Sequence, residues 1–347
     1  MTRHLLIDFD SKIPNLALMR ISAWAKKKGD IVTLIKPDEN FWLIPDKIWL
    51  SCIFTWNREN AVAFIEKLKQ SYPSAEVRYG GTGFDWGQVS GNRINLPPEI
   101  ESQIPDYALY ADDRAVGFCQ RGCDRKCPFC DVWKKEGTIR QNKYQRLTEW
   151  VPDGFRKALL LDNDIALAEK WKHDQVLNDA KDMGIKLSLT QGYDIRVLDP
   201  KQDKNAEGRA SLLAENKPWS ISFKERMLYF SWDRPFYEQM VRNGIQTLLD
   251  AGFKGRQLTC YVLVGFDTTH EEDMHRVNVL WKEYGVLPYI MPFNNRKDDE
   301  FINRLRRWAN KRWLIKSIPF ESYNTHHRST QEYKLGKIGM KMREVSS

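Results

Sequence analysis

The sequence predicts an α/β protein with two regions of parallel sheet and a basic helical extension. Short apolar segments that suit buried strands alternate with amphipathic segments along most of the 347 residues. This alternation is typical of parallel sheets, because parallel strands need a crossover segment between them. A proline-rich connector at 92–110 separates the two regions. We therefore expect an N-terminal Rossmann-like domain (1–108), a second α/β domain (109–297) and a C-terminal extension (298–347).

The first region contains four strand-like segments and two helical ones. The predicted strands are 5–8, 31–35, 47–54 and 75–79, and the predicted helices are 16–28 and 60–69. Gly29 ends the first helix. Gly80, Gly81 and Gly83 follow the last strand, where a phosphate-binding loop would lie, but the flanking residues match no phosphate-loop pattern. We therefore expect these glycines to form a tight turn.

The second region repeats the strand and helix pattern over a longer stretch. The predicted strands are 115–118, 157–161, 185–189, 227–231, 257–264 and 286–291, and the predicted helices are 165–183, 235–251 and 271–284. These segments make six βα-type units.

A cluster of thiols follows the first of these strands. Four of the six cysteines lie in the twelve-residue stretch CQRGCDRKCPFC, a density that favours a metal or iron–sulfur site over disulfides. Cys123, Cys127 and Cys130 have the spacing C-x-x-x-C-x-x-C, which lets a short loop bind three corners of a cubane cluster and leave one iron open. Cys119 falls outside that spacing, so we expect it not to be a ligand. A closed four-cysteine zinc site that includes Cys119 is the alternative.

The stretch from Cys123 to Cys130, with Phe129 before the last cysteine, resembles the signature of the radical S-adenosylmethionine (radical SAM) superfamily. The resemblance implies that these three cysteines hold a [4Fe–4S] cluster whose open iron binds S-adenosylmethionine. It implies reductive cleavage to a 5′-deoxyadenosyl radical, an electron donor such as flavodoxin or ferredoxin, and adenine near Phe129. The six βα-type units match the partial (β/α)6 TIM-type barrel of that superfamily. The resemblance extends over residues 115–292.

Polar residues follow the predicted strands, where the chemistry of such barrels lies. The resemblance implies contacts from these residues to the amino group, carboxylate, ribose and adenine of S-adenosylmethionine. In that order the residues are Asp162 and Asn163, then Arg196, then Ser231 and Asp233, then Val264 and Gly265, with Gln191 reaching ribose or substrate. The sequence departs from the family at Asp162-Asn163-Asp164, where many members have Gly-Gly-Glu. No catalytic residue is indicated.

Residues after strands are also ordinary helix caps. We expect Asp164 and Asp267 to cap helices. We also expect the acidic run after Asp267 to cap the helix that follows it. For Arg196 and Asp233 the sequence does not decide between a structural role and ligand contact.

The N-terminal region resembles the degenerate cobalamin-binding-like domain that precedes some radical SAM cores. The family's cobalamin-ligating pattern is Asp-x-His-x-x-Gly, whereas the corresponding loop here reads DFDSKIPN and has no histidine. We therefore expect no bound cobalamin, and a domain that packs on the core. Cys52 and Cys260 lie in apolar segments and are predicted core residues, which leaves no cysteines for an auxiliary cluster.

The net charge of +8 is concentrated at the C-terminal end. Residues 301–347 hold 11 Lys and Arg against 3 Asp and Glu. Arg304, Arg307 and Lys311 form a stripe at helical spacing, which is either a phosphate-binding face or a solvated one. Trp308 and Trp313 on the same segment are expected to pack against the core. The adjacent pair His326-His327 is a weak candidate for metal binding.

No apolar segment approaches the length of a membrane span, and the N-terminus does not resemble a signal peptide, so we expect a cytoplasmic protein. The leading hypothesis is a radical SAM enzyme that abstracts hydrogen from an unidentified substrate, with nucleic acid as a candidate because of the basic extension. Whether S-adenosylmethionine is consumed or regenerated stays open. The alternative is a zinc-stabilised nucleic-acid-binding protein without catalysis.

Overall fold

The computed structural model describes residues 1–84, 96–139, 143–295 and 298–324. It is a mixed α/β structure with parallel sheets, as the sequence predicted. The chain divides into two compact units, one of residues 1–117 with 146–159 and one of residues 118–145 with 160–347. The domain boundaries predicted at 108 and 297 stay predictions.

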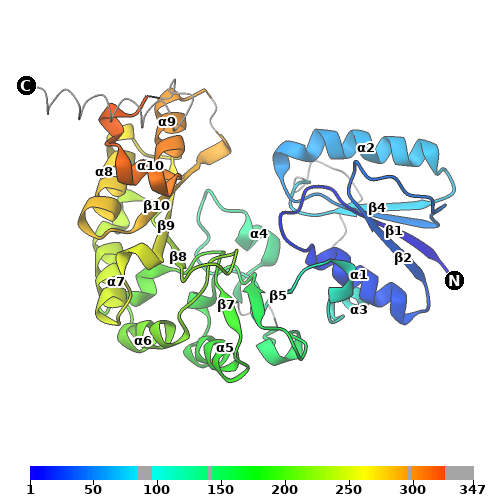
Figure 1. The fold of residues 1–347 in the computed structure, drawn as a ribbon, viewed down its shortest axis with the longest axis horizontal. Coiled ribbons are helices and arrows are strands. Elements are labelled where there is room, and N and C mark those ends of the chain that lie inside the picture. Colours follow the sequence, from blue (N-terminus) through cyan, green and yellow to red (C-terminus); the bar gives the residue numbers. More distant parts are fainter. Residues whose placement is uncertain (85–95, 140–142, 296–297, 325–347) are drawn as a thin grey trace, which may run out of the picture. The chain divides into compact units, whose positions relative to one another are not determined.

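The first unit contains a four-stranded parallel sheet with strand order β2-β1-β3-β4. Its strands are β1 (Arg3–Asp8), β2 (Ile31–Ile35), β3 (Lys47–Ser51) and β4 (Glu76–Gly80). Helices α1 (Leu16–Lys27) and α2 (Arg58–Ser71) cover opposite faces of this sheet (Figure 1). Successive side chains of a strand point to opposite faces, so Leu5 packs with Ile65 of α2 while Leu6 packs with Leu18 of α1.

The elements of the first region were predicted to within about three residues. The largest error is at β3, which was expected to continue to residue 54 and ends at Ser51. The reason is Asp10, whose carboxylate accepts hydrogen bonds from the backbone N–H groups of Ile53 and Phe54, at 2.7 and 3.0 Å. These N–H groups therefore bond to a side chain instead of a neighbouring strand.

The glycines after β4 form the expected tight turn against the end of β3. Gly81 has φ +105°, and a Cβ atom there would overlap the carbonyl oxygen of Cys52. The N–H group of Gly83 donates to that same oxygen at 2.9 Å. Cys52 itself is fully buried, as predicted. The connector holds a short helix, α3 (Pro98–Glu101), and leads to β5 (Arg114–Gly117), whose neighbour is β6 (Lys157–Leu160).

The second unit contains a parallel sheet with strand order β10-β9-β8. The strands are β8 (Leu228–Ser231), β9 (Leu258–Val264) and β10 (Leu287–Pro292). A shorter strand, β7 (Lys186–Ser188), precedes Tyr193, which makes a parallel bridge to Phe230 of β8. All six predicted strands of this region are present, each to within about one residue at both ends.

Helices follow the strands of this unit, on the pattern that the sequence predicted. They are α4 (Val132–Glu136), α5 (Lys170–Asp182), α6 (Ala206–Asn216), α7 (Glu238–Asp250) and α8 (His270–Asn278), the last continuing as a π-helical turn to Glu283. The predicted helix at 165–183 is interrupted, because Ala168 and Glu169 are extended and α5 begins only at Lys170. Helix α6 was missed, since its small and polar residues (AEGRASLLAEN) make only a weak apolar stripe.

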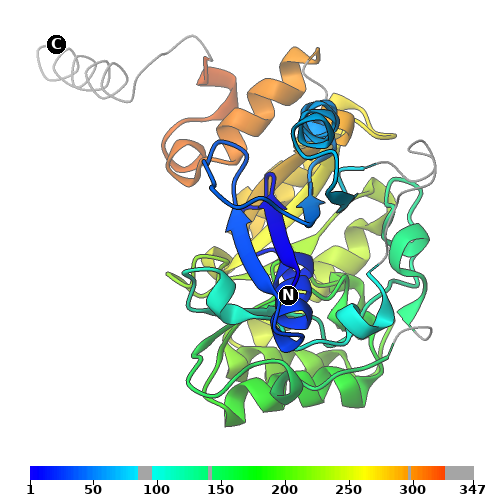
Figure 2. The same cartoon turned by 90° about the vertical axis from the view of Figure 1, so that its right-hand side faces the viewer.

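The C-terminal extension contains α9 (Glu300–Ala309) and α10 (Arg312–Ser317), which lie side by side in orange in Figures 1 and 2. Arg304 donates to the backbone carbonyls of Phe320 and Tyr323, so one cation of the predicted basic stripe serves internal packing. Trp308 is buried as predicted, whereas the prediction for Trp313 was wrong, because its side chain is 47% exposed. His326 and His327 lie outside the described residues.

Replacing Gly81 with Ala is expected to lower the free energy of unfolding by roughly 2 to 4 kcal/mol, because the new Cβ meets the Cys52 carbonyl and the residue needs a positive φ. Gly208, exposed in α6 with open space where a Cβ would lie, is the matched control. Gly208→Ala should stabilise the protein by up to about 1 kcal/mol. Urea unfolding of both variants checks this, and equal effects at the two positions would contradict it.

Candidate functional site

The cysteine loop is held at its start by two side chains that follow β6. The carboxylate of Asp162 accepts hydrogen bonds from the backbone N–H groups of Cys119 and Gln120, at 2.7 and 2.9 Å. The side-chain oxygen of Asn163 accepts from the N–H of Gly122 at 2.9 Å. Asp162 is only 3% exposed, and burial raises its pKa to about 8 although the two donors act in the opposite direction. Both residues were predicted to contact S-adenosylmethionine; here these oxygens position the loop.

The loop then folds back against its own C-terminal half. Gly122 has φ +92°, and a Cβ atom there would lie 2.7 Å from the carbonyl group of Thr138. The N–H of Cys123 donates to the carbonyl of Gly137 at 3.1 Å, and the carboxylate of Asp124 accepts from the N–H of Ile139 at 3.0 Å. Only glycine permits this close crossing, which fixes the position of Cys123.

The four cysteines of the loop differ in environment. Cys119 is 1% exposed and belongs to the core, whereas Cys123, Cys127 and Cys130 are half-buried. Burial raises the pKa of all three, to about 12 for Cys123, and the thiol of Cys130 raises the pKa of both Cys123 and Cys127 further. They therefore lie in one electrostatic neighbourhood, in which ligation to a metal would have to displace the thiol protons.

Three thiols on one short loop suit the donor set of an iron–sulfur cluster, since such clusters are held by thiolates. Within the described ranges, however, no group of three or more His, Cys, Asp or Glu side chains is arranged to hold a metal ion. The residue types thus fit a cluster, while their side chains do not converge on a single point.

A pocket lies beside the loop and collects residues from three separate segments. Its lining residues are Arg125, Lys126, Cys127, Pro128 and Phe129 of the loop, Arg196, and then Ser231, Trp232, Asp233, Arg234, Tyr237 and Val241. Five residues proposed from the sequence, namely Cys127, Phe129, Arg196, Ser231 and Asp233, therefore meet around one cavity. Gln191, Val264, Gly265, Asp162 and Asn163 are not among its lining residues.

Asp194 links two cations of this pocket. Its carboxylate accepts from Nε of Arg125 at 2.6 Å, and from Nε and Nη2 of Arg196 at 2.7 and 2.9 Å. The Arg196 guanidinium also lies 4.4 Å from the ring centre of Tyr237. One edge of the Arg196 guanidinium thus binds Asp194, while the side chain also lines the pocket. Sequence reasoning missed Asp194 and Arg125, although an acid two residues before a strand-end arginine was the available signal.

Ser231 and Asp233 lie together at the end of β8. Burial raises the pKa of Asp233 to about 6, and a hydrogen bond from Ser231 acts in the opposite direction. A hydroxyl and a carboxylate at one pocket wall can accept and donate hydrogen bonds to a polyol such as ribose.

Phe129 joins the loop to the ends of two further strands. Its ring packs edge-on against Phe266, with centroids 5.4 Å apart, and Phe266 packs against Phe293 at 4.8 Å. Phe266 directly follows Gly265 after β9, and Phe293 follows β10. The packing therefore brings Phe129 to the same edge of the sheet as the predicted adenine-contacting residues Val264 and Gly265.

The two predicted caps have different outcomes. Asp164 accepts a hydrogen bond from the N–H of Ala166 and caps the turn after β6, as predicted. The prediction for Asp267 was wrong, because its carboxylate pairs with Arg234, and α8 is capped by Thr269 in a capping box with Glu272. The acidic first turn of α8 is present as predicted.

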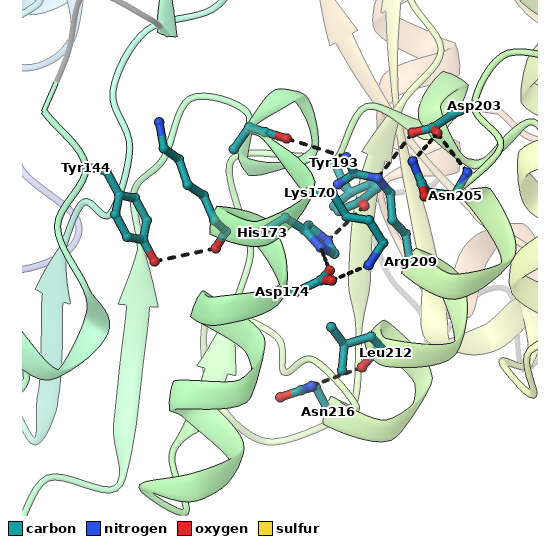
Figure 3. A network of polar contacts seen from close by, with 12 residues as sticks. Tyr144, Lys170, His173, Asp174, Tyr193, Asp203, Asn205, Arg209, Leu212 and Asn216 are labelled. Atoms are coloured by element: carbon teal, nitrogen blue, oxygen red, sulfur yellow. Dashed lines mark hydrogen bonds and ion pairs between the residues drawn. The ribbon is translucent and has the colours of Figure 1, made fainter.

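A polar network that includes Tyr193, His173 and Asp174 lies next to the segment of Asp194 and Arg196, and Figure 3 shows these three side chains. Tyr193 bonds through its N–H to the carbonyl of Tyr229 at 2.8 Å, and its hydroxyl lies 3.0 Å from Nε2 of His173 in α5. Nδ1 of His173 lies 2.9 Å from the carboxylate of Asp174. A neutral imidazole satisfies both contacts, accepting from Tyr193 and donating to Asp174. The network fixes Tyr193 and so the residue that follows it.

Comparison with known proteins adds no assignment. No protein-family model matches the sequence, and no curated protein matches it. Within the described part of the chain, no helix combines the length and apolar character needed to cross a membrane.

Asp162→Asn is expected to lower the free energy of unfolding by roughly 2 to 3 kcal/mol. Both carboxylate oxygens accept from N–H groups, so an amide places one N–H group against another. Asp113→Asn is the control, because Asp113 is 72% exposed and its ion pair with Lys157 lies at the surface. Denaturant unfolding followed by circular dichroism measures both, and an Asp162→Asn protein as stable as the control would refute the anchoring role.

His173 is expected to make the protein less stable as the pH falls from about 6.5 to about 4. Burial lowers its pKa to about 4, so in this interval the unfolded state binds a proton that the folded state does not. The free energy of unfolding should fall by roughly 3 kcal/mol from this group alone. The difference in pH slope between wild type and His173→Asn isolates it, with the exposed His275 replaced by Asn as the control. Equal slopes in wild type and His173→Asn would contradict this assignment.

Proposed function

We propose that the protein is a radical SAM enzyme that binds a [4Fe–4S] cluster and S-adenosylmethionine. The observation that carries this proposal is the pocket in which the cysteine loop meets Arg196, Ser231 and Asp233. The cysteine loop follows β5, Arg196 follows β7, and Ser231 and Asp233 lie at the end of β8. The carboxyl ends of parallel strands are where such folds carry their chemistry. A structural zinc loop has no need of such a pocket.

Each residue of the proposed site has a distinct task. Cys123, Cys127 and Cys130 would ligate the cluster, and Cys119, buried in the core, would not. When bound, the cluster and S-adenosylmethionine would supply one-electron reductive cleavage that yields a 5′-deoxyadenosyl radical. Arg196 would bind the methionine carboxylate, while Ser231 and Asp233 would orient the ribose and Phe129 would cover the adenine. The protein thereby orients the cofactor and limits access of water.

We further propose that the six strands β5 to β10 belong to a partial (β/α)6 barrel and that the first sheet is Rossmann-like. Parallel pairing, helices between successive strands and the Tyr193–Phe230 bridge support the barrel. The strand order β2-β1-β3-β4 with helices on both faces supports the Rossmann-like assignment. The absence of cobalamin, the electron donor, the cytoplasmic location and nucleic-acid binding by the basic extension stay predictions.

Anaerobic reconstitution with iron and sulfide tests the cluster. The full chain should turn brown and bind about four iron atoms. Dithionite and S-adenosylmethionine should then yield 5′-deoxyadenosine. Replacing Cys123, Cys127 or Cys130 with Ala should abolish both the colour and the product.

Cys119→Ala is the matched control, since it removes a thiol from the same loop without removing a proposed ligand. It should retain iron and product formation. A colourless protein that copurifies with zinc, and that loses zinc in the Cys119 variant, would instead establish the alternative of a zinc-stabilised binding protein.

A further inference from the structure

The sheet of the second unit has two unlike faces. One face is buried beneath helices and is lined by Phe230, Cys260 and Ile290, each no more than 1% exposed. Apart from the buried Thr259, the other face carries residues of intermediate or high exposure. These are Tyr229, Ser231, Tyr261, Leu263, Leu287, Tyr289 and Met291. The second face is rich in aromatic surface and is only partly covered.

Three tyrosines on this face form a ladder across the strands, which we call the tyrosine face (Tyr229, Tyr261 and Tyr289). The rings of Tyr229 and Tyr261 are stacked, with centroids 5.6 Å apart and planes at 14°. The ring of Tyr289 meets that of Tyr261 edge-on at 5.8 Å. Tyr261 is fixed by a hydrogen bond from its hydroxyl to the carbonyl of Thr190 at 2.9 Å. At the open end of the ladder, Tyr289 is 45% exposed and Met291 is 46% exposed.

The tyrosine face is continuous with the pocket. Ser231, which lines the pocket, is the register partner of Tyr261 in the β8–β9 pair, so their side chains share a face. Beside them is the turn of Gln191 and Gly192. A Cβ at Gly192, which has φ +100°, would lie 3.7 Å from the Tyr261 ring. The exposed Gln191 next to it offers amide donors and acceptors at the margin of the face.

The pocket contributes positive charge at this end of the sheet. Arg125 and Arg196 share the single carboxylate of Asp194, which leaves one charge uncompensated. Lys126 is exposed, with φ +48°, and makes no ion pair or hydrogen bond with the described residues. Arg234 is neutralised by Asp267, and Asp233 contributes one negative charge. The lining and its partners therefore keep a small positive excess.

We infer that the tyrosine face binds a nucleobase of a single-stranded nucleic acid, with the adjoining phosphate directed toward Lys126 and Arg125. This inference rests on the proposed function, because it assigns the substrate class of that site. Aromatic side chains accept any base by stacking, and nearby cations bind the backbone. A double helix cannot present a base to such a face without extruding it.

The test measures binding of a short fluorescein-labelled single-stranded RNA to the full chain by fluorescence anisotropy. Loss of one stacking residue should weaken binding about ten-fold in Tyr289→Ala. Tyr289→Phe keeps the ring and should stay within about two-fold of wild type. Trp42→Ala is the control, since Trp42 is 98% exposed in the first unit and does not belong to this sheet. Met291→Glu adds negative charge without removing a ring and should also weaken binding about ten-fold.

Three results would overturn the inference. The first is equal affinity in Tyr289→Ala and Trp42→Ala. The second is the same weakening in Tyr289→Phe and Tyr289→Ala. The third is binding of a labelled acidic peptide in preference to the RNA.

The outcome is separable from that of the proposed function. Iron content and 5′-deoxyadenosine formation without RNA test the cluster, whereas RNA binding is measured on metal-free and reconstituted protein alike. If the protein is brown and cleaves S-adenosylmethionine, but Tyr289→Ala leaves its RNA affinity unchanged, only the inference is refuted. Tyr289-dependent RNA binding by a protein that assembles no cluster would refute the proposed function alone.

Discussion

The position of the cysteine loop depends on the buried carboxylate of Asp162. It accepts the backbone N–H groups of two consecutive residues, Cys119 and Gln120, and Asn163 accepts that of Gly122. The loop is thus held by its backbone at the end of β6, which leaves its thiols available for other contacts. The structural role thus belongs to Asp162, which fixes the backbone of the loop, while Cys123, Cys127 and Cys130 remain half-buried.

Several acidic side chains at the strand ends are at least partly buried, and hydrogen bonds and ion pairs stabilise them there. Burial raises the pKa of Asp162 and of Asp233, and each is stabilised by donors from the surrounding chain. Asp194 is paired with two guanidinium groups, Arg125 and Arg196. Buried carboxylates are costly unless they are hydrogen-bonded or paired, and several of them at one edge of a sheet are more typical of functional sites than of cores.

The two faces of the β8–β9–β10 sheet have different roles. Strand alternation puts Phe230, Cys260 and Ile290 under the helices, and the same alternation presents Tyr229, Tyr261 and Tyr289 on the other side. The two-residue alternation of the strands therefore gives the sheet one face in the core and the tyrosine face on the other side. The pocket lies where that face reaches the cysteine loop, so the residue at the junction, Ser231, belongs to both.

The sequence by itself determined the strands, most of the helices and the cysteine spacing, because these depend on local periodicity and on neighbours along the chain. It also indicated that Arg196, Ser231 and Asp233 would meet, since parallel strands end at one edge, although other strand-end residues predicted with them do not line the pocket. Only the tertiary structure decided the partners: Asp162 with the loop backbone, Asp194 with Arg125, and Asp267 with Arg234. It likewise exposed Trp313 and buried Arg209 in the overlooked α6. These pairings join residues distant in sequence, so they follow from how the elements pack and leave no local pattern to detect.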